Sequence, residues 1–439
     1  MLRNLKTYQQ KAFNYVKDRY RIALFMEMRL GKTIVVIRWF KHREAKRILI
    51  ITPKPTFQSW KEELILEGFK EKDIAILNGT PEQRKALVQQ KTKITLANPE
   101  AITYLPEIYT DEDWDCVVID ESTRIRNPEA QITKILNKKQ IKLIPYKAIL
   151  TGLPNPESEL DFFEQMAFLW DGRYMGFNNF WSWRNAYCFQ VGYDWIMTKQ
   201  GKQKLVEELK KDAFFLSRKE AKIGSEKIYE KRYIDMDAEQ KKLYEQIKND
   251  FGYAYKKEEG DTKWIPVKLS WMQQISGGFT PDGALIYDGK AQEILHLLKT
   301  ELKNEKVVIW CKYTNEIKHL VDFITSRSNL EAIPFLGGDY SREKEFKTGK
   351  AQVIVAQPRS GMQGLDWSVA STVIYYSNWW DNEIRRQSED RVIHPNKKEP
   401  ILFIDLLTKD SIDEHVLNLL KRKNLNQFNF QKELIKCVS

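Results

Sequence analysis

Residues 24–40, LFMEMRLGKTIVVIRWF, contain three residues whose types and spacing suit the binding of phosphate groups. Gly31 lets the backbone pass close to an anion, Lys32 carries a charge that reaches phosphate oxygens, and Thr33 has a hydroxyl that can bind Mg²⁺. The usual pattern, GxxxxGK[ST], opens with a second glycine, and Met26 stands at that position. The stretch therefore predicts a phosphate-binding loop without its outer glycine.

A pair of neighbouring carboxylates, Asp120 and Glu121, ends the apolar stretch DCVVIDE at residues 115–121. A strand that ends in two acids is the usual partner of a phosphate-binding loop. The first acid holds Mg²⁺, and the second orients or deprotonates a water molecule. The other interpretation is an ordinary strand ending in a polar turn. The place of the pair downstream of the loop, with another strand between them, favours nucleoside triphosphate hydrolysis.

These groups can act together only if strands and helices bring them to one edge of a sheet. The first 155 residues alternate amphipathic helical stretches with apolar runs at 21–25, 47–53, 93–98, 115–121 and 147–152. Runs that are apolar on both faces predict buried parallel strands, and the helical stretches supply the crossovers. The phosphate-binding loop then joins a strand to a helix N-terminus, where backbone N–H groups face an anion. An α/β domain with a parallel sheet follows.

The middle of the chain, residues 156–285, has a different pattern. Segment 162–195 is dense in aromatic residues, and two charged stretches, 203–222 and 237–257, are predicted to be helical. We predict a mostly helical insertion there. From residue 286 the alternation returns and indicates a second α/β domain. Its predicted strands are 306–311, 351–357, 371–377 and 400–407.

The composition points to a polyanionic partner. The 439 residues include 71 basic and 60 acidic side chains, a formal net charge of +11. Such an excess favours nucleic acid, although a solvated surface would have the same composition. No apolar run approaches the roughly 18 residues of a membrane span, and the first residues lack a signal-peptide core. The four cysteines show no metal-ligand spacing, so we expect a protein of the reducing cytoplasm without structural zinc.

Further stretches resemble, together with these, the motif series of superfamily-two helicases and translocases, in the branch of chromatin remodellers and their small tailed-phage relatives. LKTYQQKAF at 5–13 resembles the adenine-recognising Q motif, and MRLGKT resembles motif I. ITPKPTFQSWKEE at 51–63 resembles motif Ia, DEST motif II, and LTGLPNPE at 150–157 motif III. The resemblance implies that Thr151 and Gly152 couple hydrolysis to DNA contact.

The second half continues the series in the family's order. KVVIWCKYTNEIKHL at 306–320 resembles motif IV, RSGMQGLDWSVASTVIYYSNWWDN at 359–382 motif V, and QSEDRVIHP at 387–395 motif VI. KDSIDEHVLNLLKRK at 409–423 resembles the helix that closes this domain. The resemblance covers most of the chain and implies an α/β fold of two RecA-like parallel-sheet domains in tandem. The implied bounds are 1–155 and 286–439 for these domains, and 156–285 for the mostly helical, aromatic-rich insertion.

The resemblance also implies roles for individual residues. The residues implied in catalysis are Lys32, Asp120, Glu121, Gln387 and Arg391. Those implied in ATP binding are Gln9, which would read adenine, and Arg29, Leu30, Gly31, Lys32, Thr33, Gly364 and Asp366. Those implied in DNA binding are Thr52, Pro53, Lys54, Asn98, Arg359, Ser360, Trp367 and Trp380. Mg²⁺ would be held by Thr33 and Asp120.

Motif VI departs from the family at one position. The family usually carries two arginines that stabilise the γ-phosphate, and here the first is Arg391 but His394 stands at the second position. Arginines of this kind are worth about 10³–10⁵ in rate in related phosphoryl-transfer enzymes. Three alternatives stay open: Arg391 suffices, Arg385 or Arg386 takes the second place, or the enzyme is slow. A scaffold that binds nucleotide without turnover is a fourth, and the complete set of phosphate-site residues argues against it.

Two segments allow more than one interpretation. PDGALIYDGK at 281–290 has the carboxylate–lysine spacing of a metal-dependent nuclease, and a turn or hairpin explains it as well. The aromatic residues of 162–195 fill a helical core, or one or two of them stack unpaired bases or wedge a DNA junction.

The function implied by the resemblance is an ATP-dependent DNA helicase or translocase that uses ATP and Mg²⁺ on duplex, forked or branched DNA. We expect branch migration or fork remodelling in phage replication or recombination, in the host cytoplasm, with replication or recombination proteins as further partners and no membrane association. The alternatives are an RNA helicase and a nucleotide-gated DNA-binding protein with little turnover.

Overall fold

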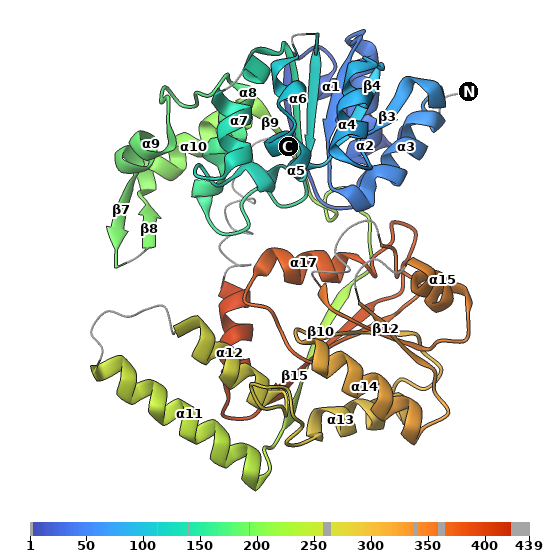
Figure 1. The fold of residues 1–439 in the computed structure, drawn as a ribbon, viewed down its shortest axis with the longest axis vertical. Coiled ribbons are helices and arrows are strands. Elements are labelled where there is room, and N and C mark those ends of the chain that lie inside the picture. Colours follow the sequence, from blue (N-terminus) through green and yellow to red (C-terminus); the bar gives the residue numbers. More distant parts are fainter. Residues whose placement is uncertain are drawn as a thin grey trace. The chain divides into compact units, whose positions relative to one another are not determined.

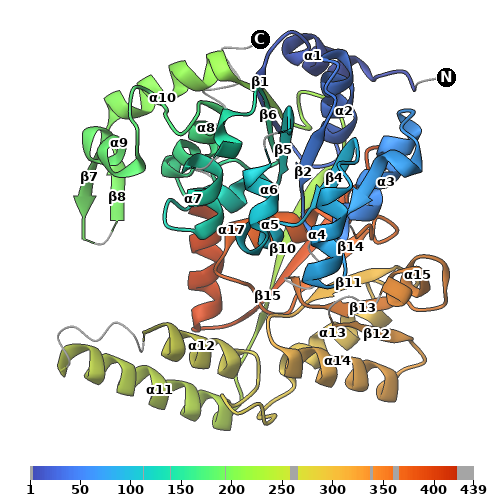
Figure 2. The ribbon, with the colours of Figure 1, turned by 45° about the horizontal axis from the view of Figure 1, so that its top comes forward.

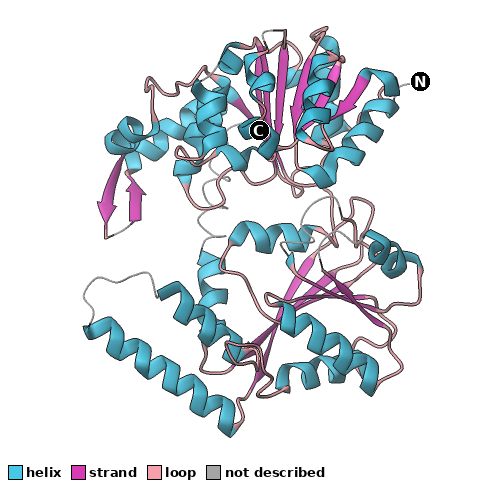
Figure 3. Ribbon diagram, in the orientation of Figure 1, coloured by secondary structure: helices cyan, strands magenta, loops and turns pink. Residues whose placement is uncertain are grey.

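The computed structural model describes residues 3–111, 113–138, 140–192, 194–257, 265–336, 340–358 and 365–422. These residues form two compact units: the first extends to Ile223 and the second begins at Gly224 (Figure 1). Each unit is a parallel β-sheet covered by helices, as the colours of Figure 3 show. No helix among the described residues combines the length and the apolar composition needed to cross a membrane.

The described residues of the first unit form a seven-stranded sheet in the order β3-β4-β2-β5-β6-β1-β9, with every neighbouring pair parallel. Because the strands are parallel, their carboxyl ends lie along one edge, where loops from different strands can meet. The strands are β1 (Arg21–Met26), β2 (Ile48–Ile51), β3 (Ile74–Ile76), β4 (Ile94–Ala97), β5 (Cys116–Asp120), β6 (Tyr146–Thr151) and β9 (Ala213–Leu216).

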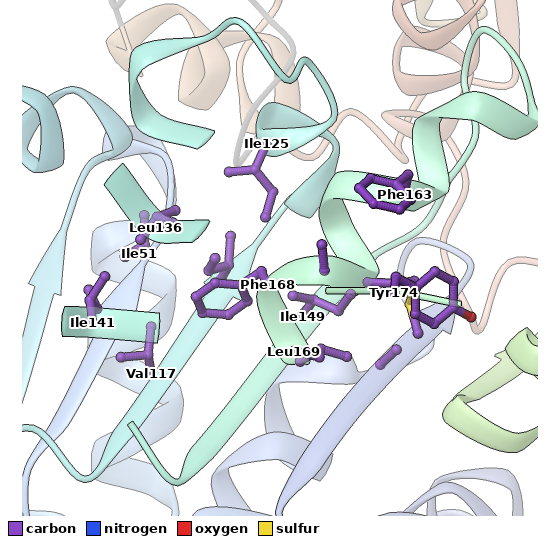
Figure 4. Close-up of a cluster of buried hydrophobic side chains, with 14 of the residues drawn as sticks. Ile51, Val117, Ile125, Leu136, Ile141, Ile149, Phe163, Phe168, Leu169 and Tyr174 are labelled. Carbon is purple, nitrogen blue, oxygen red and sulfur yellow. The ribbon is translucent and has the colours of Figure 1, made fainter. Parts of the chain in front are cut away.

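Neighbouring residues of one strand enter two different cores, because side chains alternate between the faces of a sheet. Leu24 packs in the core of one face and Phe25 in that of the other. Helices on the Leu24 face are α1 (Thr7–Val16), α2 (Lys32–His42) and α3 (Phe57–Leu66). Helices on the Phe25 face are α4 (Pro81–Gln89), α5 (Pro99–Tyr104), α6 (Pro106–Thr110), α7 (Gln131–Lys138), α8 (Phe162–Leu169), α9 (Phe180–Tyr187) and α10 (Lys199–Asp212). Figure 4 shows part of this second core, with Val117 and Ile149 of the sheet and Phe168 of α8.

A separate antiparallel hairpin follows α9, formed by β7 (Cys188–Val191) and β8 (Asp194–Met197). Phe189 pairs with Ile196 across the hairpin, and Val191 lies on the same face as Phe189. These three apolar side chains are all exposed. The hairpin projects from α9 away from the sheet of its unit in both Figure 1 and Figure 2.

The described residues of the second unit form a six-stranded parallel sheet in the order β10-β15-β14-β11-β13-β12. The strands are β10 (Lys227–Ile234), β11 (Val307–Trp310), β12 (Ala332–Phe335), β13 (Val353–Ala356), β14 (Thr372–Tyr375) and β15 (Ile401–Thr408). The helices include α11 (Ala238–Lys257), α12 (Ile265–Ser276), α13 (Gly289–Lys299), α14 (Thr314–Arg327), α15 (Tyr340–Thr348) and α17 (Asn382–Asp390), and residues 412–422 are helical as well. The prediction of two RecA-like parallel α/β sheets is confirmed.

Every apolar run predicted as a strand contains one, but the helical prediction for 203–222 is wrong at β9. Ala213–Leu216 leaves α10 and joins the first sheet beside β1, because a four-residue apolar run cannot be told from buried helix by its pattern alone. Residues 156–285 divide between the units: α8 to β9 belong to the first, and β10 to α12 to the second. Phe279 and Leu285 form an antiparallel bridge, which agrees with a hairpin at the start of 281–290.

Candidate nucleotide-binding and catalytic site

The carboxyl edge of the first sheet brings together groups that are far apart in the sequence. β1 leads into the loop with Lys32, β2 ends before Thr52, β5 ends at Asp120, and β6 ends at Thr151. β5 lies between β2 and β6, and β6 lies beside β1. These residues therefore lie at neighbouring strand ends, where open parallel sheets bind ligands.

The loop between β1 and α2 has the backbone conformation of an anion-binding turn. Arg29 and Gly31 have positive φ angles of 66° and 79°, and α2 begins at Lys32 directly after Gly31. The φ of Gly31 is one that residues with a Cβ atom rarely adopt, and a Cβ atom there would also lie 2.2 Å from Nε2 of Gln9 and displace that side chain, so glycine suits this position. The outer glycine is dispensable because Met26, which replaces it, is still part of β1.

Gln9 of α1 lies against this loop. Its side-chain amide donates to the carbonyl oxygen of Leu30 at 3.2 Å, and its Oε1 accepts the backbone N–H of Lys6 at 3.0 Å. The structure thus places the side chain that we predict to read adenine beside the predicted phosphate-binding loop. The two predictions concern one continuous site.

Lys32 is held over the same loop. Its Nζ donates to the carbonyl oxygen of Met26 at 2.9 Å and lies 3.5 Å from that of Glu27. Thr33 is half-buried, and its hydroxyl has no hydrogen-bond partner among the described residues. The ammonium group and the hydroxyl therefore sit side by side in sequence at the N-terminus of α2, where bound phosphate is stabilised.

Asp120 is oriented by two donors from neighbouring elements. Its Oδ2 accepts from Oγ1 of Thr52 at 3.0 Å and from Nε1 of Trp60 at 2.9 Å. Its Oδ1 accepts, among the described residues, only from the backbone N–H of Glu121, at 3.1 Å. A carboxylate with one oxygen held and the other lightly engaged, together with the Thr33 hydroxyl, fits Mg²⁺, which prefers hard oxygen ligands. Sequence reasoning missed Trp60, because only the fold brings α3 to the end of β5.

Glu121 has a left-handed backbone, with φ 52° and ψ 57°. Such a conformation costs a residue other than glycine of order 1–3 kcal/mol and occurs most often at functional sites. The half-buried Glu121 directly follows Asp120. This placement suits a carboxylate that orients a water molecule beside a metal-bound phosphate.

The segment after β6 lies close to the phosphate-binding loop. A Cβ atom on Gly152 would lie 3.2 Å from the backbone nitrogen of Met28, which is part of that loop. Thr151 is buried, and its Oγ1 accepts the backbone N–H of Leu153 at 3.1 Å. Gly152, one of the two predicted coupling residues, therefore lies close to the loop.

A buried glutamine joins the segment after β5 to the segment after β6. Oγ of Ser122 donates to Oε1 of Gln165 at 2.7 Å, and Nε2 of Gln165 donates to the carbonyl oxygen of Pro154 at 2.6 Å. Gln165 is fully buried on α8. A buried network of this kind holds its members in one arrangement. Sequence reasoning missed Gln165, which follows Glu164 in a helix whose other residues are apolar.

Two residues predicted to bind DNA do not fit that role in the first unit. Thr52 is fully buried, and its hydroxyl is engaged by Asp120. Asn98 is 1% exposed and its amide donates to Glu100. Both follow buried strands, so their side chains turn into the unit. Pro53 is buried as well, whereas Lys54 is exposed and forms no ion pair among the described residues.

The predicted catalytic residues of the second unit lie on and after α17. Gln387 is half-buried, and its Nε2 donates to Oε1 of Glu383 at 3.0 Å. Arg391 is 6% exposed, and its guanidinium donates to the carbonyl oxygen of Leu365 at 3.2 Å. Asp366, the next residue, donates its backbone N–H to Oε1 of Glu343 at 2.9 Å. Predictions for Arg359, Ser360 and Gly364 concern residues outside the described part of the chain.

The structure argues against Arg385 as a second arginine at the γ-phosphate. Arg385 is buried, with Nε 2.9 Å from Oε1 of Glu389 and Nη1 2.5 Å from Oδ1 of Asp405. Its guanidinium also stacks on the ring of Tyr375 at 3.4 Å. These contacts fix Arg385 in the interior of the second unit. Arg386 beside it is half-buried.

The two tryptophans predicted to bind DNA in the second unit have different environments. Trp367 is fully buried and packs against Trp310, Phe335 and Phe346, so contact with DNA does not fit its position. An aromatic side chain after a buried strand packs into the core more often than it faces solvent. Trp380 is half-buried and donates from Nε1 to Gln273 at 3.2 Å.

Most aromatic residues of 162–195 belong to the core of the first unit, as one of the two interpretations proposed. The buried members are Phe162, Phe163, Phe168, Tyr174, Phe180 and Trp183. Trp181 and Phe189 are 43% and 50% exposed. Arg184 lies between Trp181 and Trp195, with its guanidinium 4.8 Å and 3.6 Å from the two rings. The second interpretation, DNA contact, therefore concerns the α9–hairpin region.

Comparison with known families agrees with this geometry. Residues 8–276 match the SNF2-related domain, and residues 289–396 match the helicase conserved C-terminal domain. The chain belongs to the SNF2-related family. The SNF2-related match runs from α1 to the last residue of α12 and so includes the whole carboxyl edge of the first sheet.

Several characterised proteins are similar to this SNF2-related chain along nearly its whole length. The ISWI chromatin-remodeling complex ATPase ISW1 of Saccharomyces cerevisiae is 23% identical, over 98% of the chain and 41% of the relative. The ATP-dependent helicase brm of Drosophila melanogaster is 23% identical, over 95% of the chain and 28% of the relative. The putative ATP-dependent helicase/translocase YwqA of Bacillus subtilis is 23% identical, over 98% of the chain and 49% of the relative. The chain thus spans less than half the length of these relatives.

Two solved structures match this chain along most of its length, and the first of them resembles its fold. The Hef helicase domain of Pyrococcus furiosus matches with a TM-score of 0.58 and 15% identity, over 94% of this chain and 97% of that one. The SWI2/SNF2 ATPase core of Sulfolobus solfataricus in complex with dsDNA matches with a TM-score of 0.46 and 21% identity, over 98% and 95% of the two chains.

Proposed function

We propose that this SNF2-related chain is an ATP-driven translocase that moves along duplex DNA and remodels branched or forked DNA. One observation carries the proposal: Lys32 follows β1, and Asp120 and Glu121 stand at the end of β5, so all three lie at the carboxyl edge of one parallel sheet in which only β6 separates the two strands. The family membership and the net charge of +11 support it. The names of the relatives, which are helicases and remodelling ATPases, support it as well.

The proposed roles follow from the positions of the side chains. Lys32 binds the β- and γ-phosphates, Gln9 contacts adenine, and Thr33 and Asp120 hold Mg²⁺. Bound Mg²⁺ neutralises charge on the phosphates as it develops. Glu121 orients or deprotonates the attacking water, which breaks the bond between the γ-phosphorus and the bridging oxygen.

Groups of the second unit are proposed to complete the reaction. Arg391 stabilises charge on the γ-phosphate, with Gln387 beside it on the preceding helix. His394 accepts the backbone N–H of Asn396 at Nδ1, at 3.2 Å, which leaves Nε2 as the protonated nitrogen of a neutral ring. A neutral donor stabilises a phosphate less than a guanidinium does. We therefore expect turnover to be slower than in relatives with two arginines.

DNA contact is proposed to be independent of sequence. Lys54 is exposed next to the catalytic edge and suits the phosphate backbone. Trp181 and Phe189 are exposed aromatic side chains, and the guanidinium of Arg184 lies 4.8 Å from the ring of Trp181. Exposed aromatic side chains can stack on bases unpaired at a branch. Branch migration or fork remodelling would use both kinds of contact.

The biological setting is proposed from the resemblance to small tailed-phage helicases. We propose a role in phage replication or recombination, in the host cytoplasm, with replication or recombination proteins as further partners.

An ATPase assay with and without duplex DNA tests the proposal. We expect phosphate release to rise several-fold when linear or forked duplex DNA is added. Lys32→Ala should abolish nucleotide binding and turnover, whereas Glu121→Gln should keep nucleotide binding and lose turnover. Turnover that neither substitution changes would refute the assignment of the site.

One second candidate is favoured by a specific observation. Because His394 replaces an arginine, a nucleotide-gated DNA-binding protein with little turnover would fit the same site. In that case nucleotide would change DNA affinity while phosphate release stayed at background. A third candidate is an RNA helicase. It is tested by adding duplex RNA to the same ATPase assay, because RNA rather than DNA would then raise phosphate release.

A further inference from the structure

An ion pair links the phosphate-binding loop to the segment in which the first unit ends. Glu27, the first residue after β1, and Arg218, two residues after β9, lie with Oε2 of the glutamate 3.1 Å from Nε of the arginine. The backbone N–H of Arg218 donates to the same oxygen at 3.0 Å. The two side chains are 23% and 13% exposed. A partly buried carboxylate that accepts two bonds from one residue is held in a defined place.

The strands beneath this pair are locked in register. β1 and β9 pair in parallel from Ala23 with Ala213 to Met26 with Leu216. The backbone N–H of Glu27 then donates to the carbonyl oxygen of Leu216 at 3.0 Å, one step beyond the paired residues. The ion pair therefore continues a ladder that ends where the phosphate-binding loop begins.

Glu27 also lies beside Lys32, whose shorter contact is with the carbonyl oxygen of Met26 at 2.9 Å. Nζ of Lys32 lies 3.5 Å from the carbonyl oxygen of Glu27, and the backbone N–H of Leu30 donates to that oxygen at 3.4 Å. A change in the position of Glu27 consequently reaches Lys32 through one hydrogen-bond step. Arg218 binds the side-chain carboxylate of Glu27.

The segment after Arg218 is compact and leads directly into the second sheet. The backbone N–H of Ile223 donates to the carbonyl oxygen of Arg218 at 2.9 Å, and Ile223 packs on the core of the Leu24 face. The second unit begins at Gly224, and β10 begins at Lys227. Four Cα–Cα steps from Ile223 to Lys227 span at most about 14 Å. So short a connection keeps the start of β10 within about 14 Å of Ile223, and a larger displacement of β10 must therefore move the Arg218 turn.

We infer that Arg218 is a positioning residue that couples the phosphate-binding loop to the connection between the two units. Arg218 holds the side chain of Glu27, whose carbonyl oxygen lies beside Lys32. Arg218 also begins the turn that leads to β10, so movement of β10 shifts Arg218. The inference rests on the proposed translocase function and adds a route by which nucleotide and DNA binding influence each other. The physical element is a contiguous series of bonds from Lys32 to Ile223, as coupling between sites requires.

The test measures how nucleotide changes DNA affinity. The dissociation constant for a labelled duplex is determined by fluorescence anisotropy, with and without a non-hydrolysable ATP analogue and Mg²⁺. In the wild-type protein we expect the two constants to differ at least about fivefold. In Arg218→Gln we expect the ratio to fall below about twofold, because the ion pair between Arg218 and Glu27 is lost, while each ligand alone still binds.

Three further variants separate coupling from simple stabilisation of the fold. Arg218→Lys keeps a cation and should restore part of the ratio. The double variant Glu27→Gln with Arg218→Gln should be no worse than either single substitution, because both remove one interaction. Arg21→Gln removes another ion pair, with Asp171 at 2.7 Å, at the opposite end of the same strand. It should keep the wild-type ratio.

The outcomes are distinct. A wild-type ratio in Arg218→Gln would overturn the inference and leave the translocase proposal intact. If nucleotide does not change the DNA affinity of the wild-type protein, and DNA does not change its phosphate release, both the inference about Arg218 and the translocase proposal are wrong. If Arg218→Gln fails to fold by circular dichroism, the double variant Glu27→Gln with Arg218→Gln decides, because it lacks the ion pair without leaving an unpaired charge, and a wild-type ratio in that variant refutes coupling.

Discussion

Replacing Arg385 by methionine is predicted to destabilise the second unit without acting at the nucleotide. In the structure, the guanidinium of Arg385 neutralises Asp405 through Nη1 at 2.5 Å and Nη2 at 3.2 Å. It also donates to Glu389 at 2.9 Å. Asp405 joins β15 to α17, the helix that precedes Arg391. Methionine fills much of the same volume but offers no donor.

The magnitude follows from what each carboxylate keeps after the substitution. Glu389 retains Nζ of Lys227 at 2.7 Å and the hydroxyl of Tyr229 at 2.9 Å. Asp405, with a side chain only 4% exposed, retains among the described residues just the amide of Asn378, at 2.9 Å. One buried carboxylate thus loses its cation, which costs about 3–5 kcal/mol. With an m-value of about 2 kcal/mol/M in urea, the midpoint of the second unit falls by roughly 2 M.

The assay must report the second unit alone, because a chain with two units has no single unfolding free energy. Hydrogen exchange of peptides from β14 and β15, measured across a urea series, gives the global opening of that sheet. Arg327→Met is the matched control: Arg327 is 56% exposed and lies 3.6 Å from Asp288. It should cost less than about 1 kcal/mol.

A second substitution sharpens the test. Asp405→Asn added to Arg385→Met removes the carboxylate that has lost its cation. The double variant should therefore recover part of the lost unfolding free energy. A loss in Arg385→Met no larger than in Arg327→Met would refute the reasoning. Unchanged exchange combined with collapsed phosphate release would show instead that Arg385 works at the γ-phosphate.

Three further predictions concern other parts of the molecule. Trp60→Phe removes the indole donor to Asp120 and should raise the Mg²⁺ concentration for half-maximal phosphate release about tenfold; an unchanged Mg²⁺ titration would contradict the proposed role. Burial raises the pKa of Glu316 to about 7, despite the bonds from Ser377 and Tyr313. Because a raised carboxyl pKa disfavours the folded state once the unfolded group ionises, the second unit should lose about 3 kcal/mol between pH 4.5 and 7. Glu316→Gln should flatten that slope in urea titrations, and an equal slope would contradict it. Trp181→Ala and Phe189→Ala should leave thermal stability within about 0.5 kcal/mol and lower unwinding of forked DNA more than phosphate release on linear duplex; equal effects on both readouts would exclude base contact.

The strands of both sheets could be predicted where they are continuous apolar runs. β5 and β6 are buried on both faces, and their continuous apolar sequences predict this burial. β10, KIYEKRYI, could not be predicted in the same way, because it alternates exposed and half-buried residues beside a single neighbour. β9 could not be recognised as a strand because it directly follows the helical pattern of α10. Edge strands carry less apolar sequence than central ones.

The candidate site was predictable where chemistry depends on residue type and chain order. Gly31 with Lys32, and Asp120 with Glu121, can be recognised because each group sits at the end of a strand. Trp60 and Gln165 were not predictable, since their roles depend on which side chains meet after folding. Thr52 shows the opposite case. A residue typical of DNA contact turns inward because Asp120 lies on the neighbouring strand.

Displacement of a third strand from a DNA triplex tests the central claim most directly, because it reports travel along the duplex rather than nucleotide turnover or strand separation. We expect the wild-type protein to release the third strand only when ATP and Mg²⁺ are present. The Glu121→Gln variant should not release it. Vigorous DNA-stimulated ATP hydrolysis without release of the third strand would contradict translocation along duplex DNA.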